Sequence, residues 1–243
     1  MDPIHFSPDA ADLLARAKAA PPHGSGERLL PFPQGRFAAM APFVLTHRGC
    51  DDAPLNLFQG VGTRDPDYTG MTWLEFLERG RHMPANRQWW ADNPGYYTEP
   101  GRKRPAMSFV SLDGTDGYVD ADGEHRTCIA RFDFDHRVLR TLTGLSLTDW
   151  RFDEVFKGRL DRLTELIRSR RIQIEIEHQK ALVERSDNPG WKLDCYVNTL
   201  QVVDPAGCLP AGLPETLDSA GVLALTRSLS RPHWRRWFRR GGT

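Results

Sequence analysis

The spacing of apolar residues along the chain predicts several helices. In residues 152–171, Val155, Leu160 and Leu163 recur at helical spacing. Thr72 and Glu75 have the spacing of a capping box at the start of another apolar run. The pattern and its capping residues predict helices at 7–20, 69–80, 84–95, 123–132, 152–171 and 215–230.

Other segments have the shorter period of β-strands. Residues 172–177 alternate strictly between apolar and polar side chains, as in a half-exposed strand. A turn at 186–191 separates this run from a second one, which predicts a long hairpin from strands at 172–184 and 192–204. Further strands are expected in the apolar runs 43–45 and 55–61, and on both sides of the turn at 113–117.

Helices mixed with adjacent hairpins favour an α+β fold over a doubly wound sheet. Residues 21–36 are rich in proline and glycine, which indicates a linker or surface loop. The chain is therefore expected to contain an N-terminal helix and linker at 1–36, a single α+β domain at 37–230, and a basic aromatic tail at 231–243.

Composition indicates a soluble globular protein. The 243 residues are 40% hydrophobic and 26% charged, and no apolar run approaches the roughly 20 residues that span a bilayer. The N-terminus lacks the order of a signal peptide, and the four scattered cysteines form no C-x-x-C pair. A cytoplasmic protein without an integral membrane segment, a zinc site or a disulfide framework is expected.

The formal net charge of zero hides an asymmetry. Residues 231–243 carry five arginines and no acidic residue, so the rest of the chain has 27 basic side chains against 32 acidic ones, a net charge of −5. General affinity for nucleic acid would therefore have to come from local basic patches.

The segment 118–132, YVDADGEHRTCIARF, carries the main candidate chemistry. Gly123 stands where a strand and turn lead into a helix, and the first N–H groups of a helix have no partners within it. Together with the helix dipole they attract an anion such as phosphate. His125 would add a donor, and Arg126 a bidentate contact of permanent charge.

Three carboxylates lie close to this turn. Asp120, Asp122 and Glu124 offer the oxygen ligands that Mg²⁺ prefers, and Glu124 could also act as a base toward water. The alternative is an ordinary turn that leads into a helix with an acidic first turn, in which His125 and Arg126 form a solvated face.

The same segment resembles the signature of the ParB/sulfiredoxin superfamily: an apolar strand, Asp-Gly, then Gly-x-x-Arg opening a short apolar helix. The matching residues are Gly123, Glu124, His125 and Arg126, within a core motif at 108–132. The resemblance implies a ParB/sulfiredoxin-like mixed sheet with short helices, extended here by the long hairpin and the terminal helices. It also implies that the motif binds the phosphates of ATP or another nucleoside triphosphate.

Differences from the superfamily pattern limit the activities that the resemblance implies. Glu124 stands where sulfiredoxins have their reactive cysteine, and Cys128, one helical turn later, is expected in the core. Peroxiredoxin repair is therefore disfavoured. No helix-turn-helix is predicted after residue 132, unlike in the partition proteins. The chain is more similar to the plasmid fertility-inhibition and oncogenic-suppression proteins. That resemblance implies ATPase and DNase activity that blocks DNA transfer, with DNA and a coupling protein of the transfer apparatus as partners.

Residues outside the motif offer further candidates. Arg64 and Asp65 could lie beside the phosphate site. The basic loop could meet a DNA backbone or be merely solvated; it contains Arg102, Lys103 and Arg104. The tail could bind single-stranded nucleic acid, a membrane surface or a partner protein, or its aromatic residues could cover the domain's own core. Its candidate residues are Trp234, Arg235, Arg236, Trp237, Arg239 and Arg240.

The sequence leaves two hypotheses on function. In the first, the chain is a Mg²⁺-dependent phosphate-ester hydrolase. Glu124 is its base or metal ligand, His125 an acid, base or phosphate donor, and Arg126 stabilises the developing charge. In the second, the chain is a non-catalytic protein that binds a component of the transfer apparatus under nucleotide control, or a ParB-like DNA-binding regulator.

Overall fold

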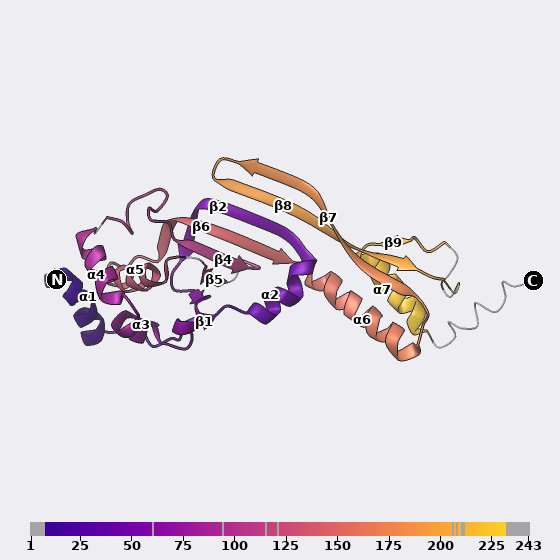
Figure 1. The fold of residues 1–243 in the computed structure, drawn as a ribbon, viewed down its shortest axis with the longest axis horizontal. Coiled ribbons are helices and arrows are strands. Elements are labelled where there is room, and N and C mark those ends of the chain that lie inside the picture. Colours follow the sequence, from indigo (N-terminus) through magenta and orange to yellow (C-terminus); the bar gives the residue numbers. More distant parts are fainter. Residues whose placement is uncertain are drawn as a thin grey trace, which may run out of the picture. The chain divides into compact units, whose positions relative to one another are not determined.

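The computed structural model describes residues 8–59, 61–93, 95–114, 116–120, 122–205, 207, 209 and 212–231. Helices in this part of the chain are α1 (Pro8–Ala19), α2 (Gln34–Met40), α3 (Trp73–Arg79), α4 (Met83–Asp92), α5 (Glu124–His136), α6 (Glu154–Arg170) and α7 (Ser219–Ser230), with 3₁₀ turns η1 (Ala41–Phe43) and η2 (Pro66–Tyr68). Strands are β1 (Leu30–Pro31), β2 (Val44–Asn56), β3 (Val61–Thr63), β4 (Ser108–Leu112), β5 (Asp116–Val119), β6 (Thr141–Phe152), β7 (Glu175–Asn188), β8 (Trp191–Val203) and β9 (Thr216–Leu217) (Figure 1).

The strands of the described residues form one mixed sheet, which confirms the α+β class. Their order is β1-β3-β5-β4-β6-β2-β8-β7, and β9 pairs with β8. The pairs β1–β3, β3–β5 and β4–β6 are parallel, whereas β4–β5 and β8–β9 are antiparallel. The predicted long hairpin is present, because β7 and β8 are neighbours joined only by Pro189 and Gly190.

The chain divides into two compact units, a different division from the one predicted. The first comprises 1–34, 47–150 and 186–193, and the second 35–46, 151–185 and 194–243. The N-terminal segment predicted as an appendage belongs to the first unit. Leu13, Ala17 and Leu29 are buried in its core, and this burial explains why the segment packs rather than extends.

Helix α5 is central to the core of the first unit. Helices α1, α3 and α4 each contact it, and its Cys128, Ile129 and Phe132 are buried. Cys128 is thus a core residue, as the sequence predicted. The β4–β5 hairpin pairs Phe109 with Val119, both buried, so it places an apolar face in the same core.

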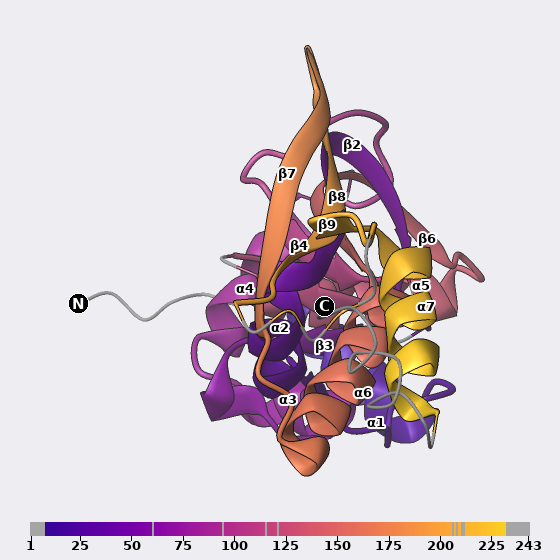
Figure 2. The same ribbon diagram turned by 90° about the vertical axis from the view of Figure 1, so that its right-hand side faces the viewer.

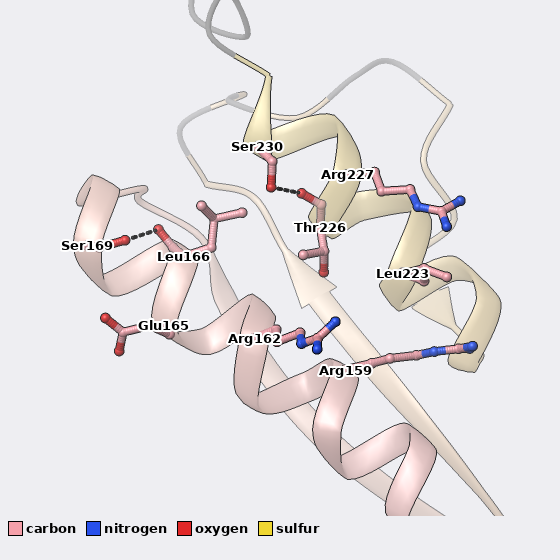
Figure 3. A pocket seen from close by; sticks show the side chains of 9 residues that line it. All are labelled: Arg159, Arg162, Glu165, Leu166, Ser169, Leu223, Thr226, Arg227 and Ser230. Carbon is pink, nitrogen blue, oxygen red and sulfur yellow. Dashed lines mark hydrogen bonds between the residues drawn. The ribbon is translucent and has the colours of Figure 1, made fainter.

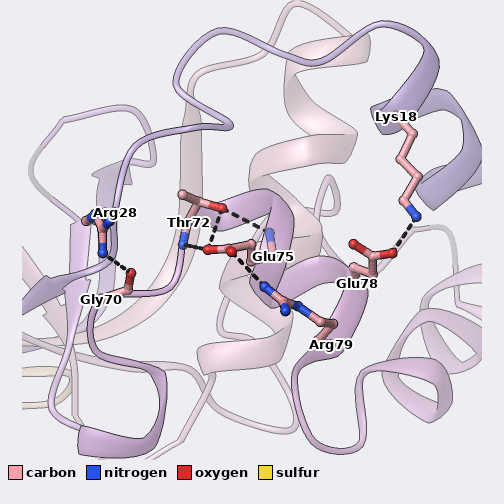
Figure 4. Close-up of polar contacts among 7 residues, drawn as sticks. All are labelled: Lys18, Arg28, Gly70, Thr72, Glu75, Glu78 and Arg79. Atoms are coloured by element: carbon pink, nitrogen blue, oxygen red, sulfur yellow. Dashed lines mark hydrogen bonds and ion pairs between the residues drawn. The ribbon is translucent and has the colours of Figure 1, made fainter.

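The predicted capping box at the start of α3 is confirmed (Figure 4). The Thr72 hydroxyl accepts a hydrogen bond from the Glu75 N–H at 3.1 Å, and the Thr72 N–H donates to the Glu75 carboxylate at 2.9 Å. Arg79 donates to the other Glu75 oxygen at 2.6 Å. The start of α3 is therefore fixed by side chains that the local sequence supplies.

In the second unit, α6 and α7 run side by side (Figure 2). Phe156 and Leu163 of α6 and Val222 and Leu225 of α7 are buried in a common core. Near the end of α6, Arg170 donates to the carbonyl oxygens of Leu229 and Ser230, the latter at 2.9 Å. These carbonyls end α7, so a side chain from the neighbouring helix satisfies them.

Several elements differ from the prediction. Strand β1 lies in the predicted linker, and β9 occupies positions that were predicted to begin the last helix. The structure has a single long strand, β2, where two short strands at 43–45 and 55–61 were expected. The middle of β2 is polar and half-exposed, so its sequence has no apolar run from which a strand would be predicted. The helix α2 begins inside the predicted linker. Strand β6 was not predicted; Gly144 has a positive φ of 77° within it, and the buried positions 144 and 145 are consecutive, which breaks the alternation.

Candidate functional site

The candidate site lies where two parallel strands end side by side. Register pairs Gly62 with Tyr118 and Thr63 with Val119, so the residues that come after β3 and β5 meet at one edge of the sheet. There the guanidinium of Arg64 forms an ion pair with Asp120 at 2.5 Å. Arg64 therefore contacts the segment 118–132, and its place beside a phosphate stays a prediction.

Gly123 forms the turn between this edge and α5. Its φ of 125° is one that side chains rarely adopt, and a Cβ atom here would lie 3.3 Å from the Cβ of Met107. The Thr127 N–H donates to the Gly123 carbonyl at 2.7 Å, which is the first bond of the helix. Gly123 is therefore the N-cap, as predicted, and it offers no side chain to the N–H groups of residues 124–126.

Glu124 is half-buried on the first turn of α5. Burial raises the pKa of its carboxyl group, and the negative charges of Asp65 and Asp122 act in the same direction. A hydrogen bond from its own backbone N–H and the charge of Arg126 oppose this rise in pKa without cancelling it. Glu124 therefore binds a proton more readily than an exposed glutamate, which suits a general base.

The His125 ring is contacted by residues of two other segments of the chain, Arg81 and Tyr68. Its Nε2 is in hydrogen-bond contact with the Arg81 carbonyl oxygen and lies 3.4 Å from the Tyr68 hydroxyl. Since a carbonyl oxygen only accepts, Nε2 carries the proton and Nδ1 is the acceptor of the neutral ring. Burial lowers the pKa of His125, although the Arg81 carbonyl favours the charged form. The imidazole is thus kept neutral at neutral pH.

Arg126 points into the protein, which corrects the expectation of a bidentate phosphate contact. Its side chain is 8% exposed, and its Nη1 donates to the Tyr96 hydroxyl at 2.9 Å and to the Pro105 carbonyl at 2.8 Å. Its Nη2 pairs with Asp122 at 2.7 Å. The physical reason is that the loop between α4 and β4 presents the Tyr96 hydroxyl and the Pro105 carbonyl to the guanidinium, and these acceptors satisfy it as it becomes buried.

The three predicted metal ligands have other partners. Asp120 pairs with Arg64, Asp122 pairs with Arg126, and Glu124 accepts from its own N–H. Within the described ranges, no group of three His, Cys, Asp or Glu side chains is placed to hold a metal ion. The three carboxylates do not form a common ligand set in this arrangement, so magnesium stays a prediction and we build no chemical step on it.

The basic loop departs from its predicted role at one residue. Lys103 is only 4% exposed, and its Nζ donates to the Glu99 carbonyl at 2.6 Å, so it does not face a DNA backbone. Burial lowers the pKa of its ammonium group. Arg102 forms an ion pair with Asp51 at 3.0 Å, and Arg104 is exposed. The candidate residues of the tail, from Trp234 to Arg240, lie outside the described part of the chain.

Two tyrosines at the site were not predicted to contribute to it. Tyr68 contacts His125, and Tyr96 contacts Arg126 while packing edge-on against Trp89 and Tyr97. The polar role of Tyr96 had no local signal, because Arg126 lies 30 residues away in the sequence.

Comparisons of the chain with models of protein families, with curated proteins and with solved structures find no match. The resemblance to the ParB/sulfiredoxin superfamily therefore rests on the motif at 108–132. Among the helices of the described residues, none has both the length and the apolar character needed to cross a membrane.

Proposed function

We propose that the turn at Gly123–Arg126 binds a phosphate group of a nucleotide or nucleic acid and hydrolyses a phosphate ester. The supporting observation is that Glu124 and His125 are consecutive residues on the first turn of α5. Burial raises the pKa of Glu124 and lowers the pKa of His125, so that each side chain favours its neutral form. Oppositely perturbed acid and base groups are concentrated at functional sites. Here they flank helix N–H groups suited to an anion.

In the proposed reaction, the phosphate lies against the backbone N–H groups of residues 125 and 126, because the Glu124 N–H already donates to its own carboxylate. Glu124 accepts a proton from a water molecule, whose oxygen attacks phosphorus while the bond to the leaving oxygen breaks. His125 is neutral and can accept a hydrogen bond at Nδ1, because Nε2–H is held by the Arg81 carbonyl. Arg126 positions the turn through Asp122 and does not touch the phosphate.

The biological setting comes from the resemblance. We propose a fertility-inhibition type of protein with ATPase or DNase activity that blocks conjugative or T-DNA transfer. ATP or another nucleoside triphosphate would be its nucleotide, and DNA and a coupling protein of the transfer apparatus its partners. The superfamily fold itself is part of this proposal. The mixed α+β sheet and the strand–glycine–helix order at 116–136 support it.

A second candidate function is favoured by one observation. Because Arg126 is enclosed by Tyr96, Pro105 and Asp122, it is not placed to stabilise charge that develops on a transferred phosphate. A site that only holds a nucleotide, and thereby regulates binding to a component of the transfer apparatus, needs no such charge. A ParB-like DNA-binding regulator would use the same turn in the same way.

The two candidates are separated by measuring binding and turnover together. Binding and hydrolysis of ATP and CTP, and cleavage of plasmid DNA, are assayed with and without Mg²⁺ for the wild type and Glu124→Gln. Asp67→Asn is the matched control, because Asp67 is an exposed carboxylate on the neighbouring turn η2. The hydrolase predicts that Glu124→Gln retains nucleotide binding and loses about 100-fold in turnover, the usual contribution of a general base.

The results have distinct meanings. Binding without turnover in the wild type supports the regulatory candidate and excludes the hydrolase. Full turnover in a folded Glu124→Gln protein removes Glu124 from the reaction. If neither nucleotide nor DNA binds, the phosphate-binding proposal itself is wrong.

A further inference from the structure

Helices α6 and α7 of the second unit leave a hollow of about 630 Å³ between them, distant in the sequence from the Gly123 turn. Figure 3 shows the side chains that line it. They are Arg159, Arg162, Glu165, Leu166 and Ser169 of α6 and Leu223, Thr226, Arg227 and Ser230 of α7.

Helical periodicity explains this lining. On α6 the positions 159, 162, 166 and 169 succeed one another at intervals of three and four, so they form one stripe along the helix. On α7 the positions 223, 226, 227 and 230 also lie on one face, since 226 and 227 follow 223 by three and four residues and precede 230 by four and three. The adjacent stripes that contain Leu163 of α6 and Leu225 of α7 are buried in the core, so both lining stripes are held on a rigid base.

The hollow combines an apolar strip with an excess of positive charge. Leu166 and Leu223, both partly exposed, supply the apolar surface, and three arginines lie around it. The one acidic lining residue, Glu165, already accepts two hydrogen bonds from Arg168, at 2.6 and 3.0 Å. Its charge is therefore compensated from outside the hollow.

The arginines differ in how far they are engaged. Arg159 donates to the Ser219 hydroxyl at 2.8 Å, a neutral partner. Arg162 and Arg227 are exposed, and neither forms an ion pair with a described residue. Their guanidinium groups can each bind a carboxylate through two parallel hydrogen bonds.

We propose that this hollow is a docking site for an acidic, amphipathic peptide segment of a partner protein. The segment's carboxylates would pair with Arg162 and Arg227, and one or two aliphatic side chains would rest on Leu166 and Leu223. Charge complementarity identifies the occupant as acidic. The lining favours a peptide over single-stranded nucleic acid, because none of the described residues around the hollow is aromatic and able to stack on a base.

The test begins without an assumed partner. Short peptides from a random library are selected for binding to the immobilised full-length chain, and the best of them is synthesised with a fluorescent label. Its affinity is measured by fluorescence anisotropy for the wild type, for the double variant Arg162→Gln/Arg227→Gln, and for Leu223→Gln. The double variant Arg16→Gln/Arg48→Gln is the matched control, because it removes two exposed arginines from the first unit.

The proposal expects selected peptides rich in Asp and Glu with interspersed aliphatic residues. Arg162→Gln/Arg227→Gln should weaken the labelled peptide by roughly tenfold or more, and added salt should weaken it further. Leu223→Gln should also weaken it without a change of charge, and the control variant should bind as the wild type does.

Several results would overturn the proposal. One is a selection that yields no acidic sequences. Another is that Arg162→Gln/Arg227→Gln and the control variant weaken peptide binding equally. An oligonucleotide that binds more tightly than the peptide, with the same dependence on Arg162 and Arg227, would assign the hollow to nucleic acid instead. If the chain self-associates and Arg162→Gln/Arg227→Gln abolishes this association, the hollow would be assigned to a second copy of the chain. None of these results depends on hydrolysis at Glu124.

Discussion

The guanidinium of Arg126 donates to the hydroxyl of Tyr96 at 2.9 Å, across 30 residues of sequence. The same group reaches the Pro105 carbonyl and the Asp122 carboxylate. The first turn of α5 therefore fixes the loop between α4 and β4. A residue that a motif comparison assigns to a ligand is used here to hold the site together.

This arrangement predicts a structural phenotype for Arg126. Arg126→Met should lower the free energy of unfolding by about 2–3 kcal/mol, because it removes the hydrogen bonds that a buried guanidinium makes to Tyr96, Pro105 and Asp122. Tyr96→Phe, which keeps the ring and removes two hydrogen bonds, one from Arg126 and one to the Pro105 carbonyl, should lower it by about 1–2 kcal/mol. Urea denaturation measures both. Arg79→Met is the control, since Arg79 forms an exposed ion pair of little energetic value. Equal stability of Arg126→Met and the wild type would contradict the assignment.

Glu124 predicts an unusual pH dependence. Burial raises the pKa of this carboxyl group in the folded protein. In the unfolded chain the pKa is about 4.3. At pH values between these two pKa values, the native protein binds more protons than the unfolded chain does. Its contribution to the free energy of unfolding therefore falls as the pH rises through this window. The stability of Glu124→Gln relative to the wild type should increase as the pH is raised from about 4 toward neutrality.

Glu75→Gln is the matched control for this pH series. The Thr72 N–H and hydroxyl lower the pKa of Glu75, so its contribution is present above the unfolded pKa and is lost as the pH falls through the folded pKa. Between about pH 4.3 and neutrality the relative stability of Glu75→Gln should therefore stay nearly constant while that of Glu124→Gln rises, and below about pH 4.3 the loss of the Glu75 contribution should appear. An equally constant relative stability of Glu124→Gln would show that the environment of Glu124 does not disfavour its charge.

Two glycines should respond oppositely to alanine. A Cβ atom at Gly144 would lie 1.9 Å from the Gly101 carbonyl oxygen, and its φ is 77°, so Gly144→Ala should cost about 2 kcal/mol or more. Gly158 lies within α6 with no neighbouring atom within 4 Å of such a Cβ, so Gly158→Ala should stabilise by about 0.5–1 kcal/mol. Thermal unfolding distinguishes the two, and a stable Gly144→Ala protein would contradict the close approach of these strands and loops.

The cap of α3 gives a fourth prediction. Thr72→Ala should destabilise the protein by about 1 kcal/mol, because the Glu75 N–H loses its acceptor. Thr164→Ala is the control: Thr164 is exposed within α6, where alanine is the better helix former. Denaturant titration should therefore order the proteins as Thr164→Ala, wild type and Thr72→Ala, from most to least stable.

Local sequence was enough to predict the elements whose causes are local. The capping box at Thr72 and the strand–glycine–helix order around Gly123 were predicted correctly, because each depends on residues within one or two turns. Strand β6 was missed because its buried positions, 142, 144, 145 and 152, do not follow a strict alternation. Gly144 has a positive φ, and a Cβ atom there would meet the Gly101 carbonyl oxygen, a contact that the local sequence does not encode.

The same distinction applies to the candidate site. The pattern identified Gly123, Glu124 and His125 as neighbours on a helix start, but the partners that set their properties come from elsewhere in the chain. Arg81 holds His125 from 44 residues away. Lys103 likewise belonged to a basic run that suggested solvent exposure, yet it is buried, and its Nζ donates to the Glu99 carbonyl and lies 5.9 Å from the centre of the Tyr96 ring.

Arg170 of α6 donates to two carbonyl groups at the end of α7, so the helix terminus is satisfied by a side chain that lies about 60 residues earlier in the sequence. The end of α7 and the end of α6 are therefore coupled: a substitution of Arg170 should affect the last turn of α7 although it lies on another helix.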